Sequence, residues 1–332
     1  MPDTVLAAVK IGAKQTELRE FPLPEIAEDA GLLKVTAAGV CGSDIPAYFR
    51  EGREPLILGH ENVGIIAKIG RIAAARWGVQ EGDRVAIEEY LACGHCEHCR
   101  QGEYRHCYLT DHRSNPSALR YGSQPVSFAP SLWGGFAQYL YLPPNAVLHR
   151  VPSAVSDHFA AMALPMGNGV QWAVIDGEVG PGKSALIMGP GQQGLACTVA
   201  ALASGASQVF VSGLAHDEYR LGVAHKLGAT ATINVEAEDL VSRVRDLTGR
   251  EGVDSVIDCT NAHGGGLVST ALDALKRKGG NLLMQANGTV DGFPFGVIGA
   301  KYVTLRPARG HSYNAVEIGL KQIASGRFPL NL

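Results

Sequence analysis

The clearest pattern of apolar and polar positions lies in the second half of the chain, where short apolar runs alternate with longer segments of helical character. The runs cover residues 184–188, 208–211, 253–258 and 281–284. Apolar runs of this length are typical of strands buried on both faces of a parallel sheet. A helix-like segment such as 218–227, followed by Gly228, is a typical crossover between them. We therefore predict an α/β fold with a doubly wound parallel sheet.

The first half of the chain has a different pattern. Short strand-like segments at 32–38, 63–69 and 82–87 are separated by turn residues, which predicts a β-rich region. Between the two halves, residues 152–183 contain apolar segments that we expect to be helices broken at Pro165 and Gly167.

A glycine-rich turn directly follows the apolar run 184–188. Gly189, Gly191 and Gly194 match G-x-G-x-x-G, and a segment rich in small residues follows. The first glycine suits a tight turn, the second a close approach of backbone to a pyrophosphate, and the third a close contact of helix and strand. The alternative is a purely structural glycine turn. As cofactor contacts we predict these glycines together with Pro190, Gln192, Gln193, Ser212, Asp217, Asn168 and Thr260.

Composition and charge narrow the classes of function. The 332 residues are enough for two domains, and 29 basic against 32 acidic residues give a net charge of −3. This balance gives no electrostatic reason to expect a nucleic acid or an anionic membrane as partner. The N-terminal residues resemble neither a secretory signal nor a membrane span, so we expect a cytoplasmic protein.

Seven cysteines, an odd number with four of them clustered, favour metal thiolates in a reducing compartment over a disulfide framework. The cluster is Cys93, Cys96, Cys99 and Cys107, spaced C-x2-C-x2-C-x7-C. Four thiolates complete a tetrahedral structural zinc site, with free surface thiols or an iron–sulfur cluster as the alternatives. His95, His98 and His106 lie between the cysteines and are expected to stay outside the zinc shell.

Two further segments carry residue types that bind zinc. Cys41 begins the segment CGSD after the strand-like run 32–38, and His60 and Glu61 belong to GHE just before 63–69. A catalytic zinc needs three protein ligands and one open position. Taken singly, Cys41 is as well explained by a buried small side chain, and His60 by a core histidine.

Together, CGSD, GHE, the four-cysteine lobe at 93–107, LWGGFAQY at 132–139 and GPGQQG at 189–194 resemble the medium-chain zinc-dependent alcohol dehydrogenases, nearest the sorbitol and threonine dehydrogenase branch. The resemblance covers nearly the whole chain. It implies a GroES-like β-rich catalytic domain at 1–151, a Rossmann domain at 152–307 and a return to the catalytic domain at 308–332. It also implies hydride transfer between NAD(P) and a small alcohol or carbonyl substrate, in a homodimer or homotetramer.

The resemblance further implies roles for single residues. Cys41 and His60 bind a catalytic zinc, and Ser43 first receives the substrate proton; the alternative for Ser43 is a turn or capping serine. The family's relay histidine falls on Pro46 here, and its third ligand position falls on Leu164, which has no donor atom. Glu61 is therefore expected to complete the zinc shell. Because relatives continue beyond the position of Leu332, the catalytic domain is expected to be incomplete.

The sequence specifies the cofactor and the substrate less clearly than it specifies the fold. An NAD site usually has an acidic residue about 20 residues beyond the glycine loop, where this chain has Gly213. Asp217 favours NAD, while Arg220 and His216 leave NADP as an alternative. We expect a secondary or cyclic alcohol bound by a lining of Trp133, Tyr48 and Leu164. Rival interpretations are a zinc-independent double-bond reductase and a non-catalytic nucleotide-binding relative.

Overall fold

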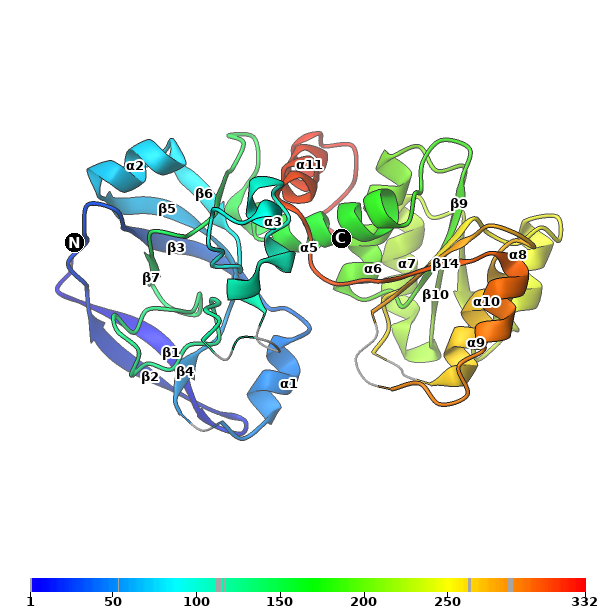
Figure 1. The fold of residues 1–332 in the computed structure, drawn as a ribbon, viewed down its shortest axis with the longest axis horizontal. Coiled ribbons are helices and arrows are strands. Elements are labelled where there is room, and N and C mark those ends of the chain that lie inside the picture. Colours follow the sequence, from blue (N-terminus) through cyan, green and yellow to red (C-terminus); the bar gives the residue numbers. More distant parts are fainter. Residues whose placement is uncertain (1, 53, 112–114, 116, 262–263, 286–288) are drawn as a thin grey trace. The chain divides into compact units, whose positions relative to one another are not determined.

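A computed structural model describes the chain except for residues 1, 53, 112–114, 116, 262–263 and 286–288 (Figure 1). The chain forms two compact units, Met1–Leu164 and Pro165–Leu332. Within the described ranges, no helix combines the length and apolar character needed to cross a bilayer.

The first unit is built on two antiparallel sheets, as its short alternating segments predict. The larger sheet has the order β7-β3-β5-β6-β8, with strands Tyr139–Leu142, Gly31–Gly39, Glu61–Ile69, Arg84–Ile87 and Leu148–Arg150. The smaller sheet has the order β2-β1-β4, with strands Gln15–Pro22, Thr4–Gly12 and Leu56–Ile57. Pairing of β3 with β5 places Gly39 opposite Glu61, so the end of one strand meets the start of the other.

The helical pieces of this unit are short and occupy its connections. They are α1 (Asp44–Phe49), α2 (Arg71–Trp77), α3 (Glu97–Arg100), η1 (Tyr104–His106), η2 (Tyr108–Thr110) and α4 (Asp157–Ala160). Of these, α1 follows β3 directly, while α3, η1 and η2 build the four-cysteine lobe.

The second unit contains a six-stranded parallel sheet with the order β11-β10-β9-β12-β13-β14. Its strands are Ala231–Asn234, Gln208–Gly213, Ser184–Met188, Ser255–Asp258, Asn281–Met284 and Thr304–Pro307. The order reverses direction between β9 and β12, and such a point is where open α/β sheets bind ligands at the carboxyl ends of their strands. The predicted doubly wound sheet is confirmed. Strands β11 and β14 are not predicted from the apolar runs, because both are short and partly polar.

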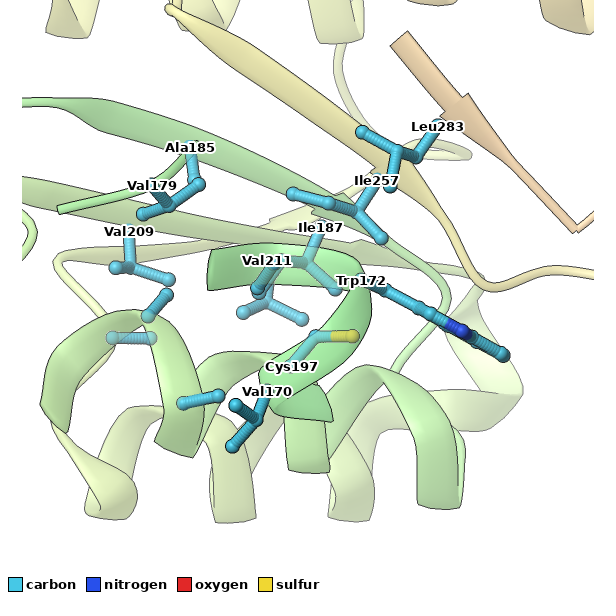
Figure 2. Close-up of a cluster of buried hydrophobic side chains, with 14 of the residues drawn as sticks. Val170, Trp172, Val179, Ala185, Ile187, Cys197, Val209, Val211, Ile257 and Leu283 are labelled. Carbon is cyan, nitrogen blue, oxygen red and sulfur yellow. The ribbon is translucent and has the colours of Figure 1, made fainter. Parts of the chain in front are cut away.

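Helices cover both faces of this sheet because its strands are apolar on both sides. One face packs against α6 (Gln192–Ala203), α7 (Glu218–Leu227), α11 (Tyr313–Ala324) and the π-helical segment η3 (Val170–Asp176). Figure 2 shows this layer, with Cys197 of α6 and Trp172 of η3 beneath Ile187. The other face packs against α8 (Leu240–Leu247), α9 (Gly265–Ala274) and α10 (Phe295–Lys301).

The expected helix break at Pro165 and Gly167 is absent. Helix α5 (Ala163–Gly169) passes through both residues and continues into η3. Pro165 lies in the first turn, where its missing N–H leaves no helical hydrogen bond unmade. Gly167 leaves room for a close neighbour, since a Cβ there would come within 2.6 Å of Val316 Cγ2.

Candidate functional site

Cys41, His60 and Glu61 lie together at the junction of β3 and β5. Cys41 follows β3, while His60 and Glu61 stand at the start of β5. One ligand atom from each residue lies within 4.8 Å of the other two. The Glu61 side chain, only 3% exposed, covers Gly39, where a Cβ would overlap its carboxylate. The donor set of one thiolate, one imidazole and one carboxylate suits zinc and leaves a fourth position free.

Asp44 orders this cluster, although the sequence analysis assigned it no role. Its Oδ2 accepts a 2.9 Å hydrogen bond from the Cys41 amide, and its Oδ1 lies 3.5 Å from His60 Nδ1. A carboxylate on one ring nitrogen of histidine leaves the other nitrogen to bind a metal. A metal bound by His60 would therefore lie on the Nε2 side, which we call the metal side of the imidazole.

The electrostatics of the site favour a cation. Burial lowers the pKa of His60, but hydrogen bonds with Asp44 and Cys41 and the charges of Glu89 and Asp44 raise it to about 11. The same acidic groups that retain a proton on the imidazole will stabilise a divalent cation in its place. The residues present thus fit the zinc that the donor set implies.

Ser43 and Glu89 both lie on the Nε2 side of His60. Ser43 Oγ is 3.5 Å from His60 Nε2, and the Glu89 Oε2 oxygen is 3.9 Å from the same nitrogen. Ser43 precedes α1, yet its side chain makes no capping hydrogen bond, which weakens the alternative that it is a capping serine. Sequence reasoning missed Glu89, and no motif marks it.

The other residues noted in this region divide into two groups. Pro46 lies inside α1 and Leu164 is buried in α5, and neither brings a donor atom. Trp133 does not support the expected substrate lining: it is 4% exposed, packs in the core with Tyr121 and Leu140, and donates its indole N–H to Phe128 and Ala129. Tyr48 donates its hydroxyl to the Lys14 carbonyl at 2.8 Å.

The four cysteines of the lobe converge on one point. Their sulfur atoms lie within 4.8 Å of one another, with Cys96 and Cys99 3.4 Å apart. Backbone amides of Cys93, Cys96 and Cys99 donate to cysteine sulfurs at 3.4–3.5 Å. Burial raises the pKa of the Cys93 thiol, but hydrogen bonds from the backbone and from neighbouring thiols lower it to about 6. All four are free thiols, and their arrangement fits a closed tetrahedral metal site.

The histidines of the lobe make other contacts. His95 Nδ1 lies 2.9 Å from the Cys93 carbonyl oxygen, and the rings of His98 and His106 are 5.6 Å apart. None of the three belongs to the group of converging donors found in the described part of the chain.

In the second unit, the glycine turn connects β9 to α6. Gly189 has a φ of +90°, and Gly194 packs so closely that a Cβ would overlap the Gly189 carbonyl oxygen. Gly191 is different: a Cβ there would meet no atom within 4 Å. The open space beside Gly191 lies at the N-terminus of α6, where helix amides attract an anion. Nearby, Gln193 Oε1 is buried with no hydrogen-bond partner among the described residues. The turn thus fits a pyrophosphate.

The remaining predicted cofactor contacts lie around the same sheet edge. Ser212 is buried at the end of β10, and its carbonyl accepts the Gly189 amide at 2.8 Å. Thr260 donates its hydroxyl to Asp258 at 2.7 Å. Asn168 Oδ1 lies 2.8 Å from His311 Nδ1. The Pro190 ring lies close to Gly213, where an added Cβ would come within 2.9 Å of Pro190 Cδ. Gln192 is exposed at the first position of α6.

Asp217 lies beside Gly213. A Cβ on Gly213 would lie 3.2 Å from the Asp217 Cβ. The Asp217 carboxylate accepts hydrogen bonds from the Leu214 amide at 3.2 Å and from Arg220 Nη1 at 3.1 Å. Arg220 thus forms an ion pair with Asp217. The residue expected to favour NAD is therefore paired with a residue that could favour NADP.

Comparison with known proteins agrees with this geometry. Residues 27–153 match the model of the alcohol dehydrogenase GroES-like domain, and residues 194–325 match that of the zinc-binding dehydrogenases. A probable alcohol dehydrogenase of Mycobacterium tuberculosis H37Rv is 36% identical over 98% of this chain and 88% of its own length. Sorbitol dehydrogenase of Bacillus subtilis is 32% identical over 84% of this chain and 74% of its own.

A solved structure extends the likeness to the fold. The alcohol dehydrogenase TADH from Thermus sp. ATN1 superposes with a TM-score of 0.82 at 30% identity, covering 97% of this chain and 90% of that one. The identities, the coverage and the two domain matches lead to one assignment. The chain belongs to the medium-chain, zinc-binding alcohol dehydrogenase family of NAD(P)-dependent oxidoreductases.

Proposed function

We propose that this protein oxidises an alcohol, secondary or cyclic, to the corresponding carbonyl compound with NAD(P). The observation that carries the proposal is the convergence of ligand atoms from Cys41, His60 and Glu61, with the Ser43 hydroxyl 3.5 Å from His60 Nε2. A zinc-independent double-bond reductase has no use for these donors together, which disfavours the main rival.

We propose Cys41, His60 and Glu61 as the ligands of a catalytic zinc and the four cysteines as those of a structural zinc. A zinc bound at the first group acts as a Lewis acid that makes the substrate hydroxyl more acidic. Asp44 holds His60 in the orientation needed for binding, through its 3.5 Å contact with Nδ1.

Ser43 is the proposed first acceptor of the substrate proton. Its hydroxyl lies on the metal side of His60 and is exposed. Because Pro46 has no side chain that carries a proton, Ser43 passes its own hydroxyl proton on, as it receives that of the substrate, to water, to the cofactor ribose or to another side chain. The serine is thus both acceptor and exit.

For the cofactor, we propose that the pyrophosphate binds at the glycine turn, with Gly189, Gly191 and Gly194 and the α6 amides around it. Pro190, Gln192, Gln193, Ser212, Asn168 and Thr260 are proposed as further contacts. Asp217 beside Gly213 supports NAD over NADP, because a carboxylate accepts the ribose hydroxyls and repels a 2′-phosphate.

Three finer assignments remain proposals. We retain the domain scheme 1–151, 152–307 and 308–332, and a cytoplasmic setting in keeping with seven free thiols. We also propose a homodimer or homotetramer, in which β14, an edge strand that closely follows the exposed Tyr302, pairs with a second copy. Light scattering after size-exclusion chromatography tests the oligomeric state.

The activity itself is tested with a panel of alcohols and both nicotinamide cofactors, read by the absorbance of the reduced nicotinamide before and after treatment with a chelator. We expect that some alcohols are oxidised, that the rate is higher with NAD than with NADP, and that this activity disappears when the chelator removes zinc. Activity that survives complete removal of zinc would favour the double-bond reductase, and its absence with every substrate would favour a non-catalytic relative.

A further inference from the structure

Glu89 brings a second carboxylate to the metal side of His60, and the structure shows what holds it. Its Oε2 lies 3.9 Å from His60 Nε2, while its Oε1 lies 4.0 Å from Arg120 Nη1. The two side chains are 21% and 15% exposed, so this ion pair is shielded from much of the solvent. Glu89 is not among the donors that converge within 4.8 Å of one another, so it stands beside the proposed ligand set and outside it.

Arg120 is itself fixed from two directions. Its Nε and Nη2 donate hydrogen bonds to the Thr110 carbonyl at 3.0 and 2.7 Å. Its guanidinium also lies over the ring of Tyr90, 4.7 Å from the ring centre. The backbones run side by side, with a bridge between Tyr90 and Arg120 and a 3.3 Å hydrogen bond from the Tyr121 amide to the Glu89 carbonyl.

Thr110 joins this arrangement to the four-cysteine lobe. It is fully buried, and its hydroxyl donates to the carbonyl oxygens of Cys107 and Tyr104 at 2.8 and 2.9 Å. A continuous path of contacts therefore runs from Cys107 through Thr110, Arg120 and Glu89 to His60.

We propose that Arg120 is a positioning residue, anchored on the four-cysteine lobe, that holds the Glu89 carboxylate beside the catalytic metal site and keeps it from closing the open ligand position. The inference rests on the proposed catalytic role of Cys41, His60 and Glu61. The Glu89 carboxylate lies between Arg120 and His60, and loss of Arg120 removes the positive charge that draws this carboxylate away from the metal side. Arg120 therefore preserves the position at which a substrate hydroxyl binds.

Arg120→Met keeps a side chain about as long as the arginine stem but removes the guanidinium, with its charge and its hydrogen bonds. Zinc affinity at the weaker of the two sites should rise by about three- to tenfold, because a nearby positive charge is lost and a carboxylate is released. Turnover should fall by about tenfold, the size typical of changes next to metal ligands. A merely structural arginine predicts the reverse for zinc, since a loosened site binds metal less tightly.

Zinc affinity is measured by competition with a chromophoric chelator, and turnover with the best alcohol of the panel. Glu89→Gln in the Arg120→Met background should abolish the gain in zinc affinity, because a neutral amide is a poor zinc ligand. Arg120→Lys should give intermediate values, since it keeps the charge but not the paired hydrogen bonds. Arg84→Met is the matched control: Arg84 also bonds one carbonyl oxygen and one carboxylate, those of Val155 and Asp157, and its loss should leave the zinc affinity within twofold.

Zinc affinity that falls or stays unchanged in Arg120→Met would overturn the proposal, as would a gain that persists without the Glu89 carboxylate. The affinity measurement needs no turnover. If the zinc response is as expected but no alcohol is oxidised, the proposed function fails and the positioning role stands. If alcohols are oxidised but the zinc affinity does not respond, only the positioning role fails.

Discussion

The glycine turn offers a substitution that should separate cofactor binding from folding. Gly191 lies at the N-cap of α6 with φ −70° and ψ −176°, values that alanine adopts without strain, and a Cβ there meets no atom within 4 Å. Replacing glycine by alanine stabilises the folded protein by about 0.4–1 kcal/mol, because the unfolded chain has less conformational entropy to lose. Alanine is, however, a poorer N-cap residue than glycine by about the same free energy. We therefore expect Gly191→Ala to change the free energy of unfolding by less than about 1 kcal/mol.

Cofactor affinity should respond very differently. The added methyl occupies the open space in which the pyrophosphate approaches the α6 amides. Loss of one charge-assisted hydrogen bond there costs about 1.5–3 kcal/mol, or roughly a 10- to 150-fold rise in Kd. Urea denaturation gives the stability, and quenching of protein fluorescence by NADH gives the Kd.

Gly194→Ala is the matched comparison. Its Cβ overlaps the Gly189 carbonyl oxygen, so the fold itself should lose about 1–3 kcal/mol of stability. If Gly191→Ala binds NADH within twofold of the parent, the pyrophosphate does not lie at this turn and the reasoning is wrong.

Three further predictions concern the metals and one ion pair. Cys96→Ser should sharply lower stability or solubility, because bound metal orders a lobe with little apolar content. If the variant loses one zinc ion per chain but keeps the melting temperature of the parent, that zinc has no structural role. Glu61→Gln should lose the weaker zinc together with activity, measured by elemental analysis; full occupancy with slower turnover would make Glu61 only a neighbour of the site. Although burial raises the pKa of Asp254, hydrogen bonds from Lys276 and Ser184 lower it to about 2, so the pair contributes stability above about pH 4 that is lost as the pH falls through 2. Lys276→Met should therefore cost about 1–2 kcal/mol at pH 7 and clearly less at pH 2, where the Asp254 carboxyl is about half protonated, as urea denaturation at both values will show.

Much of the fold could be predicted because local pattern and tertiary structure agree. Strands β9, β10 and β13 are apolar on both faces, and the turn at Gly189 needs a positive φ that glycine supplies. The donors Cys41 and His60 could be found because they follow or precede strand segments that the sequence marks. Pairing of Gly39 with Glu61 then brings them together.

Features that depend on long-range packing could not be predicted in this way. Glu89 and Arg120 are 31 positions apart, and the bridge that brings their segments together, between Tyr90 and Arg120, lies outside the named strands. Trp133 looked like a pocket wall, but its position beside Tyr121 and Tyr141 places it in a core. Gly213→Asp, which favours NAD on the pattern of the sequence alone, is now expected to be strained, because its Cβ would lie 2.9 Å from Pro190 Cδ.

The proposed mechanism depends on a catalytic zinc that is held by Cys41, His60 and Glu61 and is distinct from that of the four-cysteine lobe. Its most direct test is to remove zinc stepwise with a chelator while zinc content per chain and alcohol oxidation are followed in the same samples. We expect two zinc ions per chain at the start, with activity lost in proportion to the first ion removed and the fold lost only with the second. Full activity in a protein that retains a single zinc, bound by the four cysteines, would contradict it.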